Sequence, residues 1–145
     1  LEVAIASFVR GKVLVVDTGY YAQRLLNLCK SSQRRKPAIS SLEMVDVSDI
    51  EQLSGNYDWI VGVYTETARA FKNDPKTLRS LADRLGAKLL VDSTATIALE
   101  TDHDIMDVIA YSSCKGLFGI TGASFISYNS SDFIFEPSLP MTIFF

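Results

Sequence analysis

An aspartate and a lysine each follow an apolar run of the sequence. Asp92 ends the run KLLVD, and Lys115 lies in the small-residue turn SSCKG that follows the run VIAYS. In enzymes that use pyridoxal phosphate (PLP), an acid faces the pyridinium nitrogen and a lysine forms a Schiff base with the cofactor. We therefore interpret Asp92 and Lys115 as a candidate pair for holding PLP.

Each of the two residues also has a plainer interpretation. Lys-Gly is a short pattern that recurs by chance in surface turns, and Asp-Ser commonly ends a strand. The order along the chain favours the interpretation as a PLP-holding pair, because Asp92 and Lys115 follow successive strand-like runs. Ligands of parallel α/β sheets bind beyond the carboxyl ends of the strands.

Strand-like and helix-like segments alternate along the chain. Runs typical of strands cover residues 12–17, 44–47, 59–63, 88–91, 108–111 and 124–128. Helical spacing or capping signals cover residues 2–9, 19–30, 49–53 and 75–85. This alternation predicts an α/β fold with three layers, α/β/α, around a mostly parallel sheet. Asp17, residues 65–67, Asp92 and residues 112–115 would then share one edge of the sheet.

Composition narrows the function classes. The 145 residues are enough for one domain with a real core, and the net charge is −3. The only basic block is Arg34-Arg35-Lys36, so a nucleic-acid partner is not expected. No apolar run has the length of a membrane span, so a membrane partner is not expected either.

The cysteines and the histidine indicate neither a disulfide nor a metal site. Cys29 and Cys114 lie in unrelated contexts, which is typical of free thiols and favours a cytoplasmic location. His103 is the only histidine, and one histidine without a second cluster of ligands does not indicate a metal site. We interpret His103 as a solvated loop residue.

Three segments, in this order, resemble the large domain of the class V aminotransferases, which are PLP enzymes of fold type I. KVLVVDTGYYAQRLLNLC resembles the family's strand followed by a Gly-x-aromatic-Gly-x-Arg segment. VYTETARAFKNDPKTLRSLADRLGAKLLVDS resembles its Glu-Ser/Thr segment, helix and LLVD strand, and SSCKGLFGITGASFISY resembles its lysine loop. Within the class, the chain looks nearest to 2-aminoethylphosphonate–pyruvate and alanine–glyoxylate transaminases.

The resemblance implies a partial domain. Residues 1–145 would be one PLP-binding large domain that lacks two parts of the family pattern: the glycine-rich phosphate loop expected before Leu1, and the C-terminal small domain. The family usually has a glycine soon after the Ser/Thr position, where this chain has Ala68-Arg69-Ala70.

The resemblance also implies roles for individual residues. Lys115 would attach the cofactor and move a proton at the substrate's α-carbon, and Asp92 would pair with the ring nitrogen. Tyr21 falls where the family has an aromatic that stacks on the PLP ring, although a helical aromatic is often a core residue instead. Thr67 matches the Ser/Thr that hydrogen-bonds the cofactor's phenolic oxygen; the alternative is ordinary turn chemistry.

Ser113 and Cys114 fall at positions that hold the cofactor's phosphate in the family. A thiol is a poor hydrogen-bond donor, so phosphate contacts from Cys114 would be weak. The plainer interpretation of both residues is a tight turn of small side chains.

The function implied is a PLP-dependent aminotransferase that moves an amino group from a small donor, such as 2-aminoethylphosphonate, to a ketoacid such as pyruvate or glyoxylate. Such enzymes are homodimers whose active sites take groups from both subunits. One alternative is a cysteine desulfurase-like PLP lyase, although Cys114 stands where those enzymes usually have histidine. The other is a non-catalytic or truncated α/β domain used for dimerisation.

Overall fold

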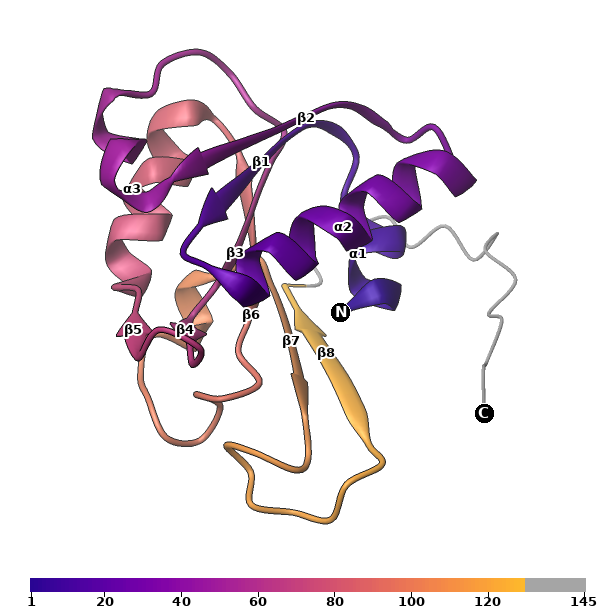
Figure 1. The fold of residues 1–145 in the computed structure, drawn as a ribbon, viewed down its shortest axis with the longest axis vertical. Coiled ribbons are helices and arrows are strands. Elements are labelled where there is room, and N and C mark those ends of the chain that lie inside the picture. Colours follow the sequence, from indigo (N-terminus) through magenta and orange to yellow (C-terminus); the bar gives the residue numbers. More distant parts are fainter. Residues whose placement is uncertain (130–145) are drawn as a thin grey trace.

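A six-stranded sheet forms the centre of the structure, a computed structural model that describes residues 1–129 (Figure 1). In spatial order the strands are β2 (Ile39–Asp46), β1 (Gly11–Asp17), β3 (Trp59–Val63), β6 (Lys88–Asp92), β7 (Val108–Ser112) and β8 (Ser124–Tyr128). The first five are parallel, and β8 runs antiparallel to β7. The predicted mostly parallel sheet is therefore confirmed.

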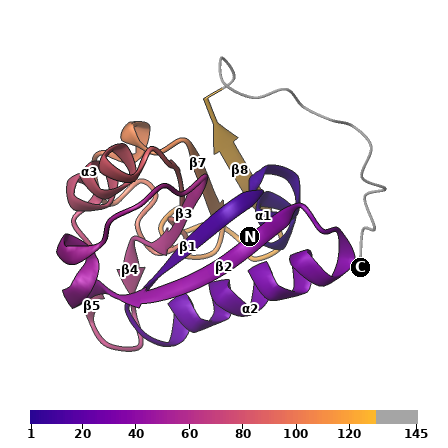
Figure 2. The ribbon, with the colours of Figure 1, turned by 90° about the horizontal axis from the view of Figure 1, so that it is seen from above.

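Helices cover both faces of this sheet (Figure 2). One face carries α1 (Glu2–Phe8) and α2 (Tyr20–Arg35). The other carries α3 (Pro75–Leu85) and the 3-10 helix η1 (Val47–Gln52). This arrangement confirms the three layers that the alternation of segments predicts.

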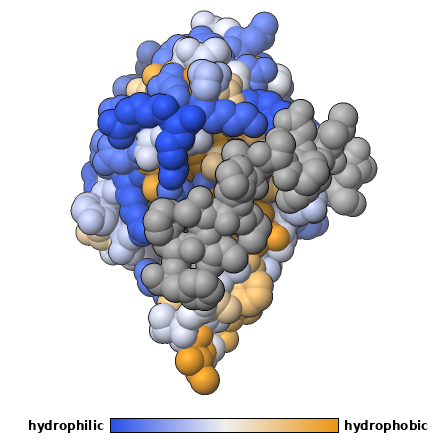
Figure 3. Space-filling model, turned by 90° about the vertical axis from the view of Figure 1, so that its right-hand side faces the viewer, coloured by the Kyte–Doolittle hydropathy of each residue, from blue (hydrophilic) through white to orange (hydrophobic). Residues whose placement is uncertain are grey.

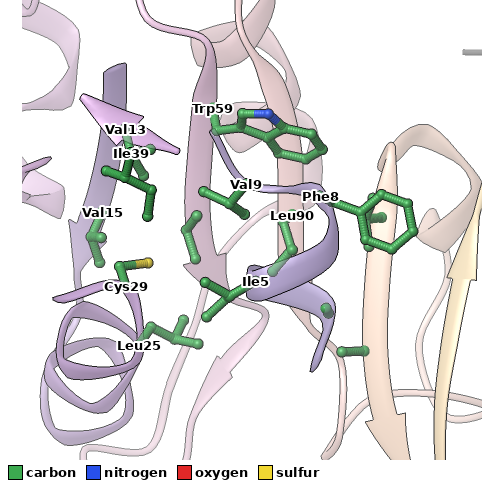
Figure 4. Close-up of a cluster of buried hydrophobic side chains, with 14 of the residues drawn as sticks. Ile5, Phe8, Val9, Val13, Val15, Leu25, Cys29, Ile39, Trp59 and Leu90 are labelled. Atoms are coloured by element: carbon green, nitrogen blue, oxygen red, sulfur yellow. The ribbon is translucent and has the colours of Figure 1, made fainter. Parts of the chain in front are cut away.

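The strands divide their side chains between the two faces, as successive residues of a strand must. Figure 4 shows the first core cluster, in which Val13 and Val15 of β1 face Leu25 and Cys29 of α2. Leu14, the residue between the two valines, belongs to the second cluster with the leucines of α3. Both faces of the central strands are buried, which explains their continuous apolar runs.

Local signals fix the ends of α3. The Asp74 side chain accepts a hydrogen bond from the Lys76 amide at 3.0 Å, and Pro75 begins the helix. Gly86 ends it in the left-handed conformation, with φ 67°. The structure thus has a cap at each end of residues 75–85, the segment for which the sequence gives helical and capping signals.

Two elements extend well beyond their predicted bounds, and three short ones were not predicted. Strand β2 begins at Ile39 and α2 continues to Arg35. As an edge strand β2 is only partly buried, so it lacks the apolar run that marks a central strand. The hairpin of β4 (Thr65–Glu66) and β5 (Phe71–Lys72) and the 3-10 helix η2 (His103–Ile105) are too short to give a periodic pattern.

His103 corrects one expectation. Its ring is partly buried and stacks on Tyr64, with 5.2 Å between ring centroids. Its Nε2 lies 3.3 Å from the Thr96 hydroxyl, and burial lowers the pKa of the imidazole. The interpretation of His103 as a solvated loop residue was wrong, because a single histidine in an acidic stretch gives no signal of a tertiary contact.

Candidate active site

A cavity of about 460 Å³ lies at the edge of the sheet where the parallel strands end. Four of the six predicted site residues line it: Tyr21, Thr67, Asp92 and Lys115. They come from α2, the turn between β4 and β5, the end of β6, and the loop after β7. Segments up to 94 residues apart in the chain therefore converge on one cavity, as the shared edge of a parallel sheet predicts.

Asp92 is held in a fixed position. It is the last residue of β6, paired in register with Val63 of β3 and Ala110 of β7. Its Oδ1 accepts a hydrogen bond from the Thr94 amide at 2.9 Å. Within residues 1–129, its Oδ2 has no hydrogen-bond partner, so this oxygen is available to a ligand in the cavity.

Lys115 lies on the exposed loop that joins β7 to β8. Its Nζ is 5.4 Å from the centroid of the Tyr21 ring, and within residues 1–129 the ammonium has no hydrogen bond or ion pair. The next residue, Gly116, donates from its amide to the Thr94 carbonyl at 3.2 Å. The loops that follow β6 and β7 thus contact each other through their backbones, and this contact links the segments that carry Asp92 and Lys115.

Gly116 is required for this contact between the two loops. A Cβ at this position would collide with the carbonyl oxygen of Ile97. Only glycine allows the lysine-bearing loop to lie so close to the loop after β6.

Tyr21 is distinguished from its neighbour Tyr20 by burial. Tyr20 is 68% exposed, whereas Tyr21 is partly buried and lines the cavity. The two rings meet edge to face, with 5.2 Å between their centroids. The ring of Tyr21 is therefore the one that can contact a planar ligand beside Lys115.

Ser113 and Cys114 do not line the cavity. The Ser113 hydroxyl donates to the Ile120 carbonyl at 2.6 Å and accepts from the Ala123 amide at 3.3 Å, so it closes its own loop. The exposed Cys114 thiol lies 3.4 Å from the hydroxyl of Ser112. Ser112, which the sequence places at this edge of the sheet without a role, lines the cavity instead.

The two thiols differ in acidity. The contact with Ser112 lowers the pKa of Cys114, and the nearby charge of Lys115 acts in the same direction. Burial raises the pKa of Cys29 to about 12. Cys114 is therefore the more reactive of the two cysteines.

Glu66 is a buried residue at this site to which the sequence assigned no role. Its Oε2 accepts from the amides of Tyr21 and Ala22, at 2.9 and 3.4 Å. Its Oε1 accepts from the Ala68 amide at 3.3 Å. The one local feature that indicates a distant capping group is Gly19, because a helix whose N-cap is glycine has no side chain there to accept from its first amides.

Within residues 1–129, no group of three or more His, Cys, Asp or Glu side chains could bind a metal ion. No helix in this part of the chain combines the length and the apolar character needed to cross a membrane.

Comparison with known proteins identifies relatives in sequence, although no family model matches the chain. It is 30% identical over 140 residues to a 2-aminoethylphosphonate–pyruvate transaminase of Cupriavidus taiwanensis, covering 87% of this chain and 36% of that protein. It is 27% identical over 141 residues to the protein of the same name from Pseudomonas aeruginosa, covering 90% and 38%. The chain thus spans a little over a third of the curated relatives that it matches.

Solved structures show the same fold. Alanine–glyoxylate aminotransferase from Nostoc sp. matches with a TM-score of 0.72 and 20% identity, over 89% of this chain and 37% of that one. A cysteine desulfurase from Thermococcus onnurineus matches with a TM-score of 0.73 and 18% identity, over 95% and 38%. At these identities the match shows the fold alone, and the aminotransferase and the desulfurase have the same fold.

Proposed function

We propose that this chain, which is related to the class V aminotransferases, forms the PLP-binding part of an aminotransferase. One observation carries the proposal. Asp92 and Lys115 follow adjacent parallel strands and line a single cavity, with the Tyr21 ring beside the lysine. Residues 1–145 would then belong to one large domain, as the order of the sequence segments predicts.

The groups that line the cavity suit PLP. The cavity volume is within the range of small-molecule sites, roughly 300–1,000 Å³. The free oxygen of Asp92 can accept from a protonated ring nitrogen, and the ammonium of Lys115 is not committed to an acceptor within the described residues. Tyr21 offers a ring face, and the exposed Thr67 offers a hydroxyl.

Bound PLP would supply an electron sink for the charge that forms when the substrate loses its α-proton. Lys115 would hold the cofactor through its ε-amino group and carry the proton to and from the α-carbon. Asp92 would keep the ring nitrogen protonated, because its negative charge favours the cation. Tyr21 would stack on the ring, and the Thr67 hydroxyl would donate to the ring's phenolic oxygen.

For the substrates, we propose 2-aminoethylphosphonate as the amino donor and a ketoacid such as pyruvate or glyoxylate as the acceptor. Support comes from the names of the sequence relatives. A phosphonate donor is a small anion with a primary amine, and the cavity is lined by the cation of Arg24 as well as by Lys115.

We also propose that the protein is a cytoplasmic homodimer. Apolar side chains are exposed on the loop beside Lys115, with Phe118 at 80% and Ile120 at 91% exposure. Figure 3 shows hydrophobic surface at the lower end of the molecule, where this loop lies in Figure 1. A second subunit would cover such a surface. Both cysteines are unpaired, which fits a reducing compartment.

A cysteine desulfurase-like lyase is the second candidate, because a desulfurase shares the fold. That reaction needs a cysteine substrate and no ketoacid acceptor. A protein that converts cysteine to alanine, with the sulfur released as sulfide by an added thiol reductant, and that does not transfer amino groups would favour this candidate over the aminotransferase. A non-catalytic dimerisation domain would do neither.

The test is borohydride reduction of the full-length protein with added PLP, followed by peptide mass mapping. We expect a pyridoxyl adduct on Lys115. The protein with Lys115→Ala should give none, while Lys30→Ala, on the exposed face of α2, should leave the adduct unchanged. A folded protein that gives no adduct, or gives it equally at other lysines, would refute the proposal.

A further inference from the structure

The buried carboxylate of Glu66 needs an explanation, because burying a charge is costly unless hydrogen bonds compensate for it. The side chain is 0% exposed. Its hydrogen bonds within residues 1–129 come from backbone amides alone: Tyr21 and Ala22 on α2, and Ala68 in the turn after β4. The carboxylate is therefore compensated by amides from two separate segments.

The start of α2 depends on this carboxylate. The first amides of a helix have no partner within the helix, and Gly19 at the N-cap has no side chain to supply one. Glu66 supplies the missing acceptor, and its negative charge is favourable at the positive end of the helix. A Cβ on Gly19 would lie 3.1 Å from Cγ of Glu66, so glycine also leaves room for the carboxylate.

The same carboxylate also fixes the turn that carries Thr67. Glu66 directly precedes Thr67, and its Oε1 binds the Ala68 amide that directly follows. A second tie between the two segments is close by, since Arg69 Nη1 donates to the Thr18 carbonyl at 3.3 Å. Tyr21 and Thr67, which lie 46 positions apart in the chain, are thus joined through one side chain.

We infer that Glu66 is a positioning residue that sets Tyr21 and Thr67 in the relative places needed to contact the face and the phenolic oxygen of one cofactor ring. The inference rests on the proposed function and adds a determinant of ring orientation to it. Glu66 itself is assigned no contact with the cofactor. It acts through Tyr21, whose amide it binds, and through Thr67, which lies between Glu66 and the Ala68 amide that it binds.

Glutamine is the sharpest replacement, because it keeps the size of the side chain and changes only its hydrogen-bonding capacity. A carboxylate accepts at both oxygens, whereas a side-chain amide accepts at one and donates at the other. If the glutamine oxygen caps α2, its NH₂ group faces the Ala68 amide, which is also a donor. One of the two segments must then lose its partner.

The experiment is a double-mutant cycle on the affinity of the full-length protein for PLP, measured by absorbance titration. Glu66→Gln should weaken binding about tenfold in the unsubstituted background, the size of one lost charge-assisted hydrogen bond. With Tyr21→Ala already present, the same change should weaken it under about threefold, because coupled residues are not additive. Glu100→Gln is the matched control: Glu100 holds the same hairpin through an exposed ion pair with Lys72, and its loss should change affinity under about twofold.

Hydrogen exchange of the protein without PLP gives a readout independent of the cofactor. Glu66→Gln should speed exchange at the amides of Tyr21, Ala22 or Ala68 at least about tenfold, while Glu100→Gln should not. If Glu66→Gln does not fold, Glu66→Asp takes its place in the same cycle, with a shortened carboxylate that keeps the charge.

The possible failures are distinct. Equal loss of affinity in both Tyr21 backgrounds would overturn the positioning role and leave the proposed function intact, as would unchanged exchange at all three amides. An unsubstituted protein that binds no PLP would overturn the proposed function, and the positioning role with it.

Discussion

The two walls of the cavity are built on different principles. The first, here called the hairpin wall, consists of the start of α2 and the β4–β5 hairpin, joined by the buried carboxylate of Glu66. The second, the lysine loop, covers residues 112–123 and is mostly exposed. Its hydrogen bonds are largely internal, as when the Gly119 amide donates to the Ser113 carbonyl at 2.7 Å.

This difference in structure matches a difference in the proposed roles of the two walls. The hairpin wall carries groups that need only keep their places against a flat ring, and a buried polar network is suited to that task. The lysine loop carries the amine that must bond, release and carry a proton. Its main tie to the rest of the domain is the backbone contact of Gly116 with the loop after β6.

The largest effect should come from the lysine loop. Lys115→Ala removes the only lysine among the described residues that line the cavity, so we expect transamination to fall by about 10²–10⁴-fold or more. Steady-state kinetics on the full-length protein would measure this. Added methylamine should restore part of the rate if Lys115 acts as a base. A Lys115→Ala protein that keeps normal activity without added amine would contradict this role.

Asp92→Asn should have the next largest effect. The amide keeps the hydrogen bond to the Thr94 amide but removes the charge that stabilises a protonated ring nitrogen. We expect kcat to fall about 100-fold, with a smaller change in PLP affinity. Asp104→Asn, an exposed change in η2, is the control. Equal kinetics for the two variants would place the essential acid elsewhere.

Gly116→Ala tests the tie between the two loops. The added Cβ would collide with the Ile97 carbonyl oxygen, so the lysine loop must move away from β6. We expect slower formation of the Lys115 adduct, roughly tenfold, and a loss of about 1–3 kcal/mol in the free energy of unfolding.

The control for Gly116→Ala is Gly62→Ala in β3. Its Cβ would meet a side-chain atom of Leu78 at 3.7 Å, which is an ordinary contact distance. If both substitutions slow the adduct equally, the close approach at Gly116 is not what places the lysine.

Much of this comparison could be predicted from the sequence, and the reason is physical. Buried parallel strands are visible in the sequence as apolar runs, and the polar residues that follow each run must lie at one edge of the sheet. Asp92 and Lys115 therefore line one cavity, as expected. The three layers follow from the same alternation.

The tertiary role of Glu66 could not be predicted in the same way. Two of its three partners, Tyr21 and Ala22, lie more than 40 residues away, and all three are backbone amides, which carry no residue identity. The choice between Ser112 and Ser113 also depends on a loop that folds back on itself over ten residues. Such contacts leave no periodic pattern in the chain.

The openness of the lysine loop can be tested with its cysteine. The Ser112 contact lowers the pKa of Cys114, so more thiolate is present at neutral pH and alkylation by iodoacetamide should be fast. Ser112→Ala should raise that pKa, shift the rate–pH curve to higher pH and slow alkylation severalfold at pH 7. Cys29, with its pKa near 12 and no exposure, should react only on unfolding. Equal labelling of both cysteines in the native protein would contradict this contrast.

The smallest expected effect is at the turn of the hairpin wall, where Ala70 stands in the stretch in which the family usually has glycine. Ala70 has φ 51°, a left-handed conformation that costs a residue with a Cβ roughly 1–2 kcal/mol. Ala70→Gly relieves this strain but adds freedom to the unfolded chain, which returns about 0.4–1 kcal/mol. We therefore expect a net gain of about 0.5–1 kcal/mol in the free energy of unfolding, measured by urea denaturation. Ala68→Gly, in the same turn without a positive φ, should be neutral or destabilising. If both substitutions destabilise the protein equally, the positive φ of Ala70 carries no net cost, and backbone strain in this turn does not lower the stability of the hairpin wall.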